Sequence, residues 1–421
     1  MENVRPNPLR AWAVWIAGIG LLLAFLIFIS REEPAPHPQP VPSAPMTATP
    51  APASAAAPPA ALPAERDPQA EAALRQGLEA MQQKDLSGAT RAFARAVQSD
   101  PRSALARDYL GIAYLQQRRF PQALQQFQEE VRLTPKVATG WARIADVHYA
   151  QNDLKGAAQA LERAVAIEPN VAQLHFNLGM LYPRMMELNK AVESLKRCVA
   201  LEPANHNAHF LLGNLLLKLA RLDEAEQAMQ AATRLAPNVG AYHFGLAEVY
   251  LKRAATPENT EKARQELTRA LELGMPEAAA IHYDLGLCYQ RQEKWEEARR
   301  ELETAVKLSP DSSAAYYTLQ EALQRLGRTE EARQAMARFR ALRAQADAQR
   351  QRDFYFQEVQ RNPDSADARF QLADYLERAG DRAQARQVLQ RARQLAAQGK
   401  GGPGLQQRIA ALAARLQTDG N

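Results

Sequence analysis

From about residue 70 to residue 399, apolar side chains recur at the spacing of amphipathic helices, and the whole pattern repeats every 34 residues. Prolines mark the repeat, because a proline lacks an N–H donor and ends a helix. They stand at this spacing at Pro101, Pro135, Pro169, Pro203 and Pro237, and again at Pro276 and Pro310. A large apolar residue stands eight residues before six of these prolines, at Phe93, Phe127, Leu161, Leu195, Met229 and Leu302. Each repeat is therefore predicted to finish with an amphipathic helix.

The first half of each repeat predicts a second helix. Leu110-Gly111 with Tyr114 recurs in register as Leu178-Gly179 with Tyr182. Leucine and tyrosine four residues apart share one helix face, and the small residue allows a close antiparallel neighbour. The pattern resembles the tetratricopeptide (TPR) repeat, W-x2-L-G-x2-Y…A-x3-F…P. This resemblance implies an all-α, right-handed superhelical solenoid of about nine helical hairpins.

The domain plan follows from the register and its two interruptions. Eight units are expected over residues 67–346, a helix extension over 347–363, a ninth unit over 364–399 and a capping helix over 400–421. An insertion around residues 256–259 should lengthen one inter-helix turn. Residues 330–360 contain no proline or glycine and predict one long helix, with Phe354, Phe356 and Val359 packing at its far end.

The N-terminal segment predicts a membrane anchor. Residues 11–29 carry no charge, and at about 1.5 Å per residue a helix of this length spans a bilayer. A cleaved signal peptide is the alternative, but a charged Arg31-Glu32-Glu33 follows in place of a cleavage site. Arg5 and Arg10 precede the span, which predicts that residues 1–10 are cytoplasmic and the repeats periplasmic or otherwise extracytoplasmic, most simply at a bacterial inner membrane. Residues 30–66 are rich in proline and alanine and are expected to be a disordered spacer.

Composition excludes several kinds of chemistry. The net charge is +5, and only two cysteines are present, far apart and in apolar helical contexts. No phosphate-binding, dinucleotide, serine-hydrolase or zinc-protease motif occurs. Neither an enzyme, a cofactor, a metal site nor a nucleic-acid partner is predicted. The basic surplus lies in the last hundred residues, and a solvated helix face explains it as well as an acidic or anionic-lipid partner does.

Four histidines occupy the same place in successive repeats, at His175, His209, His243 and His282. A metal ladder would need ring nitrogens about 2 Å from one ion, whereas stacked helices lie about 8–10 Å apart. Packing between hairpins is the preferred interpretation.

An aromatic row occupies the next position along, and it is the candidate binding site. In the resembled family this position faces the concave groove, and neighbouring asparagines hold a bound peptide backbone. The resemblance assigns this role to Phe176, Asn177, Phe210, Asn214, Phe244, Tyr283 and Tyr317. Packing against the adjacent helix is the alternative. The basic positions that clamp a terminal carboxylate in TPR co-chaperones are mostly unmatched, with Arg143 as a lone exception.

The predicted function is a non-enzymatic, membrane-tethered scaffold that binds extended segments of other proteins in its groove. Similar bacterial proteins serve assembly, secretion or maturation of envelope proteins. A glycan-binding or polysaccharide-export component, with sugars stacked on the aromatic row, is the alternative.

Overall fold

The structure is a computed structural model, and it describes residues 67–417. These residues form nineteen α-helices and one short 3₁₀ helix, and the described part contains no strand. The predicted anchor (11–29) and spacer (30–66) lie outside the described residues. Within residues 67–417, no helix combines the length and the hydropathy that a membrane crossing requires. The chain divides into two compact units, one ending at Met275 and the other starting at Pro276.

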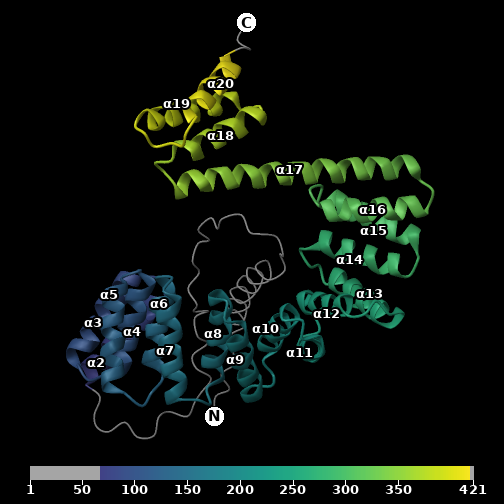
Figure 1. The fold of residues 1–421 in the computed structure, drawn as a ribbon. Helices are drawn as coiled ribbons and strands as arrows, with labels where there is room; N and C mark the ends of the chain where they lie inside the picture. Colours follow the sequence, from purple (N-terminus) through teal and green to yellow (C-terminus); the bar gives the residue numbers. More distant parts are fainter. Residues whose placement is uncertain (1–66, 418–421) are drawn as a thin grey trace. The chain divides into compact units, whose positions relative to one another are not determined.

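The first unit is a series of six antiparallel helical hairpins (Figure 1). Their bounds are α2 Pro68–Gln82 and α3 Leu86–Ser99, α4 Ala104–Gln116 and α5 Phe120–Leu133, α6 Thr139–Ala150 and α7 Leu154–Ile167, α8 Ala172–Leu181 and α9 Leu188–Leu201, α10 His206–Lys218 and α11 Leu222–Leu235, α12 Gly240–Lys252 and α13 Pro257–Glu272. The 3₁₀ helix Tyr182–Met185 follows α8 directly.

The insertion predicted near residues 256–259 has a smaller effect on the turn than expected. The turn 253–256 is only one residue longer than the turn 219–221 of the preceding hairpin. The extra sequence mostly extends the helix, since α13 has 16 residues where α11 has 14. Thr256 caps α13 by accepting a hydrogen bond from the Asn259 amide at 3.1 Å.

The two helices of a hairpin lie close because a small residue faces a large one. A Cβ added at Gly111 would stand 2.4 Å from the Phe127 ring, and one at Gly179 would stand 2.5 Å from Leu195 Cγ. Such distances are well inside van der Waals contact, so no larger residue fits without moving the helices. The glycine of the first helix and the large residue eight before the proline thus form one packing pair.

The histidine row has a structural role in the first unit. The ring Nε2 atoms of His175, His209 and His243 lie 2.8, 3.1 and 3.0 Å from the carbonyl oxygens of the prolines six residues earlier. Arg107 makes the same contact with Pro101, at 2.9 Å. Each side chain therefore ties the start of a first helix to the loop before it. In residues 67–417, no three His, Cys, Asp or Glu side chains converge as a metal site would need.

The second unit contains three further hairpins and a last helix. Their bounds are α14 Ala278–Arg291 and α15 Trp295–Leu308, α16 Ser313–Arg325 and α17 Thr329–Arg361, α18 Ala366–Arg378 and α19 Arg382–Ala397, and α20 Leu405–Gln417. The long helix expected over 330–360 is α17. Phe356 and Val359 at its end pack on the core of α18–α20 as predicted, but Phe354 does not, since it is 56% exposed.

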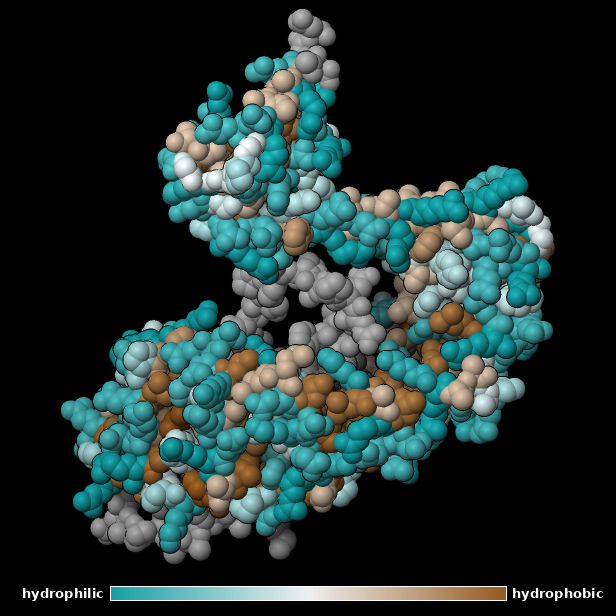
Figure 2. All heavy atoms as spheres, viewed as in Figure 1, coloured by the Kyte–Doolittle hydropathy of each residue, from teal (hydrophilic) through white to brown (hydrophobic). Residues whose placement is uncertain are grey.

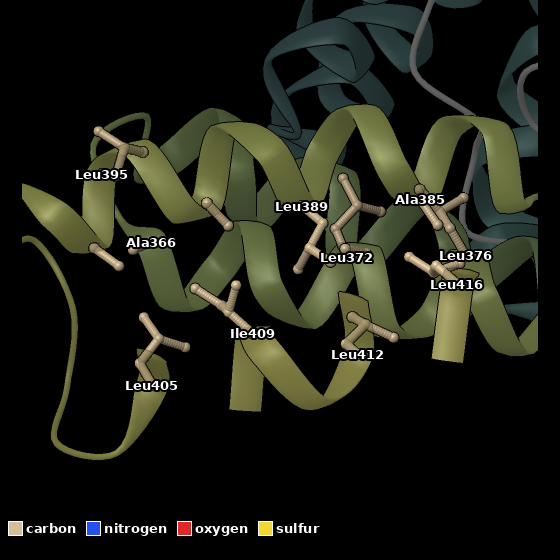
Figure 3. Packing of buried hydrophobic residues seen from close by; sticks show 13 residues of the cluster. Ala366, Leu372, Leu376, Ala385, Leu389, Leu395, Leu405, Ile409, Leu412 and Leu416 are labelled. Carbon is tan, nitrogen blue, oxygen red and sulfur yellow. The ribbon is translucent and has the colours of Figure 1, made fainter. Parts of the chain in front are cut away.

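Helix α20 covers the open end of the last hairpin. Leu405, Ile409, Leu412 and Leu416 point into the α18–α19 pair, and each is at most 3% exposed (Figure 3). Arg408 and Arg415 form ion pairs of 2.8 Å with Asp367 and Asp374 of α18. Part of the basic surplus thus holds this helix in place, as the predicted capping role requires.

Candidate functional site

The first helices of the hairpins line one side of each unit. Consecutive first helices touch each other at α4·α6 and α10·α12 in the first unit and at α14·α16 in the second. Consecutive second helices do not approach one another to the same extent in residues 67–417. In a curved stack the elements on the inner side are closer together, so the first helices form the concave face. Side chains exposed on them are the candidates for binding.

Two residues of the aromatic row, Phe176 on α8 and Phe244 on α12, are half-buried on the first helices of the first unit. They offer apolar ring surface that is neither fully packed nor fully solvated. Figure 2 shows hydrophobic side chains gathered over α10, α11 and α12 on the face in view. These two rings keep the accessibility that the predicted groove requires.

Phe210 does not, and its assignment to an open groove is wrong. It is 0% exposed, and its ring centroid lies 4.7 Å from that of Tyr242 on α12. The cause is Gly245, where an added Cβ would meet the Phe210 ring at 3.1 Å. Without a side chain at that position α12 closes over Phe210, so this ring is a core residue between two hairpins.

The Tyr242 hydroxyl holds the same two helices together through polar contacts. It donates to Asn207 Oδ1 at 2.7 Å and lies 2.7 Å from His206 Nδ1. Burial raises the pKa of Tyr242 and lowers the pKa of His206, so both are neutral at physiological pH. This neutral pair locks α10 to α12 next to Phe210.

The two predicted asparagines also differ. Asn177 is half-buried, and its Oδ1 accepts a 2.8 Å hydrogen bond from Gln173 on the same exposed turn. Asn214 is 2% exposed and its Nδ2 has no partner within the described residues. Asn214 therefore does not reach the surface, and the prediction that it holds a bound backbone is wrong in this conformation.

The remaining two predicted residues belong to the second unit. Tyr283 is half-buried and packs against the core of α15–α17. Tyr317 is 52% exposed, and its ring centroid lies 5.3 Å from that of Phe339 on α17. The seven predicted residues are thus divided between two units, and each unit presents only its own part of the row.

A cluster of charged residues on α4, α5 and α6 was missed by the sequence reasoning apart from Arg143. Arg143 Nε donates to Asp108 Oδ1 at 2.9 Å, and its Nη1 lies 3.6 Å from Asp146 Oδ2. The three side chains are only 15%, 14% and 11% exposed. Since two carboxylates flank this guanidinium, Arg143 is not available to clamp a terminal carboxylate.

Glu130 on α5 belongs to the same cluster, because the charges of Asp108 and Arg143 both act on it. It is 4% exposed, and its Oε2 has no hydrogen-bond partner within the described residues. Burial, with a contribution from the nearby Asp108, raises the pKa of Glu130 to about 8. Burial likewise raises the pKa of Asp146 to about 6 and raises the pKa of Asp108 despite Arg143. One guanidinium does not compensate three partly or fully buried carboxylates.

The repeat register contains a signal for Glu130. Seven other second helices carry a small residue at the equivalent position, and all seven are at most 1% exposed: Ala96, Ala164, Cys198, Ala232, Ala270, Ala305 and Ala392. A glutamate in a core position of a repeat stands out once the repeats are aligned. That comparison of second helices would have led to the cluster.

A pocket of about 390 Å³ lies between α6 and α7 of one hairpin. Arg163 lies over the Trp141 ring at 4.6 Å, and His148 Nδ1 is 2.9 Å from Asp153 Oδ2. Asp153 also caps α7 through the Gly156 amide. These contacts join α6 to the start and middle of α7 and stabilise the hairpin.

Comparison with known proteins agrees with this architecture. Sequence models of tetratricopeptide repeats match residues 74–138, 145–185, 187–249, 254–320, 292–352 and 355–400. No curated protein matches the chain.

Several solved structures match part of this chain. One is YrrB, described as a TPR protein with an unusual peptide-binding site, with 22% identity, a TM-score of 0.40, and coverage of 46% of this chain and 97% of YrrB. Another is PilF of Pseudomonas aeruginosa, with 20% identity, a TM-score of 0.41, and coverage of 52% of this chain and 95% of PilF. A third is TTC0263 of Thermus thermophilus, with 26% identity, a TM-score of 0.34, and coverage of 43% and 99%.

Proposed function

Because this chain belongs to the tetratricopeptide repeat family, we propose that it is a non-enzymatic scaffold that binds extended segments of other proteins. The observation that supports this most is the pair of half-buried rings, Phe176 and Phe244, on the first helices of the first unit. Rings that are stably held and partly exposed supply apolar contact area at low entropic cost. The polar side chains around them, such as Asn177, suit a peptide backbone.

The proposal includes a membrane tether, which rests on the sequence of residues 11–29. The bias of Arg5 and Arg10 toward the N-terminal side puts the repeats outside the cytoplasm. Residues 30–66 would hold the repeats away from the bilayer, as a proline-rich chain extends by about 3.1 Å per residue. A scaffold in this location would serve the assembly, secretion or maturation of envelope proteins.

The binding face is tested by changing the two accessible rings together. We expect Phe176→Ala with Phe244→Ala to reduce recovery of at least one protein partner about tenfold in proximity labelling with the full chain, because each ring contributes contact area in the binding face. Phe354→Ala is the matched control, since it removes a more exposed phenylalanine from the second unit. Equal recovery of the partner by the wild type, the double variant and Phe354→Ala would contradict the proposal. Capture of polysaccharide that survives protease treatment would favour the glycan-binding alternative.

The tether is tested separately with reporters fused after Asn421. We expect alkaline phosphatase to be active and a reporter that folds only in the cytoplasm to be inactive, because the repeats follow the span on its outer side. Deleting residues 11–29 should reverse both results. An active cytoplasmic reporter on the full chain would show that the proposed topology is wrong.

A further inference from the structure

We propose that the first unit contains a cation-accepting subsite, in which Asp108 and Asp146 receive a lysine or arginine side chain of the bound protein segment, with the unpartnered oxygen of Glu130 nearby. This inference rests on the proposed function, because it names the chemistry of the segment that the same concave face would bind. The three carboxylates come from consecutive helices, α4, α5 and α6.

The first argument is the charge balance of the cluster. Asp108 and Asp146 share one guanidinium, and Arg143 is committed to Asp108 through the 2.9 Å contact. Asp146 forms a longer ion pair of 3.6 Å with the same guanidinium. One further positive charge with several N–H donors would complete the cluster, and lysine and arginine side chains have that chemistry.

The second argument is the unpartnered oxygen of Glu130. A buried carboxylate oxygen without a donor costs free energy. The eight other second helices of residues 67–417 lack this glutamate, which shows that the fold does not need it: Ala or Cys occupies seven of these positions and Phe339 the eighth. The carboxyl group lies beneath the loop-to-helix entry at Gly140, where an added Cβ would be 3.4 Å from Glu130 Cδ. Its Oε2 is left as an acceptor for a further N–H donor.

The third argument is access. Asp108, Arg143 and Asp146 lie on α4 and α6, which are first helices, and their side chains keep 14%, 15% and 11% exposure. Leu105, one turn before Asp108 on α4, is 46% exposed. The pattern fits a segment in which a basic residue stands close to an apolar one, with the apolar residue against Leu105. Such a subsite binds a positively charged group, whereas a carboxylate clamp binds a negatively charged one.

A bare metal ion does not fit this site as well as a side chain does. No three acidic, histidine or cysteine side chains in residues 67–417 are arranged to coordinate one. Arg143 stands between Asp108 and Asp146 and would repel an ion there. A long side chain can approach from the open face and keep its charge clear of the guanidinium.

The experiment selects random phage-displayed peptides on the full chain in detergent, and measures the affinity of the selected peptides for the wild type and for Asp146→Asn. We expect enrichment of lysine or arginine, and an affinity loss of at least about tenfold in Asp146→Asn. Replacing that basic residue by norleucine should weaken binding to the wild type by a similar factor and change binding to Asp146→Asn little. Asp146→Asn should fold, because it removes a buried charge. Glu129→Gln, one residue from Glu130 on α5 but 36% exposed, is the control and should bind as the wild type does.

The outcomes separate this inference from the proposed function. Peptides without basic residues, or a norleucine effect that is equal in both proteins, would overturn the subsite. If the selected peptides still lose affinity when Phe176 and Phe244 are changed to alanine, the proposed protein-binding face is supported and only the cation subsite is wrong. A failure to recover any binding peptide would count against both.

Discussion

Replacing Phe210 by alanine should lower the free energy of unfolding by about 3 to 5 kcal/mol, the usual cost of deleting a fully buried phenylalanine. The ring fills the space between α10 and α12 beside Tyr242 and Gly245. Its removal leaves a cavity that Gly245 has no side chain to fill. In a solenoid, stability comes from the contacts between neighbouring hairpins. The interface between α10 and α12 should therefore unfold more readily than the other hairpin interfaces.

Hydrogen exchange measured by mass spectrometry is the suitable test, because it resolves α10 and α12 from the rest of the chain. We expect faster exchange in these two helices of Phe210→Ala than in other hairpins. Phe244→Ala is the control at the same repeat position, and since Phe244 is half-buried its effect should be clearly smaller. Equal effects of the two changes would mean that Phe210 is not a core residue. If Phe210 is a core residue, a partner that no longer binds Phe210→Ala has lost a folded α10–α12 interface, and this loss does not show a groove contact.

Glu130→Gln should make the first unit more stable at pH 8, on the order of 4 kcal/mol at most, and should change little at pH 4. The pKa of Glu130 is about 8 in the folded chain, against 4.5 for an ordinary glutamate. The folded state therefore binds the proton more tightly than the unfolded state. Its contribution to stability is fully present below about pH 4.5 and is lost as the pH rises through 8. Glutamine keeps the shape and cannot ionise.

The measurement is the urea midpoint of the wild type, Glu130→Gln and Glu129→Gln between pH 4 and pH 8.5. Other groups titrate in this range: His243, for example, has a raised pKa because Glu266 lies 2.6 Å from its ring. Asp108, Arg143 and Asp146 face Glu130 and remain in all three proteins. The difference between Glu130→Gln and the control isolates Glu130. A difference that does not grow with pH would show that Glu130 is not held as an uncompensated acid.

The architecture was predictable because it depends on local rules repeated many times. Each proline ends a helix whichever side chains surround it, and the pair of Gly111 with Phe127 appears in the sequence as a fixed spacing. The absence of proline and glycine between residues 330 and 360 likewise predicts α17, from Thr329 to Arg361. Such features need no knowledge of distant contacts.

The candidate site was less predictable because exposure depends on the next hairpin. Phe176, Phe210 and Phe244 are equivalent in the repeat, yet only Phe210 is covered, and the cause is Gly245 in the following repeat. Asn214 is buried in the same region of α10. Glu130 could have been found from the register alone, but its proximity to Arg143 required the packing of α5 against α6.

The fit between small and large residues restricts how a gene of this kind can recombine. Gly111 accommodates the ring of Phe127, whereas the next repeat has Ala145 at the register position of Gly111 and the smaller Leu161 at that of Phe127. A crossover inside a hairpin that joined the helix of Ala145 to the helix of Phe127 would place a methyl group where the ring lies. A crossover in the loops that follow the prolines exchanges both partners together. Duplications and losses that preserve the protein should therefore have their breakpoints in those loops.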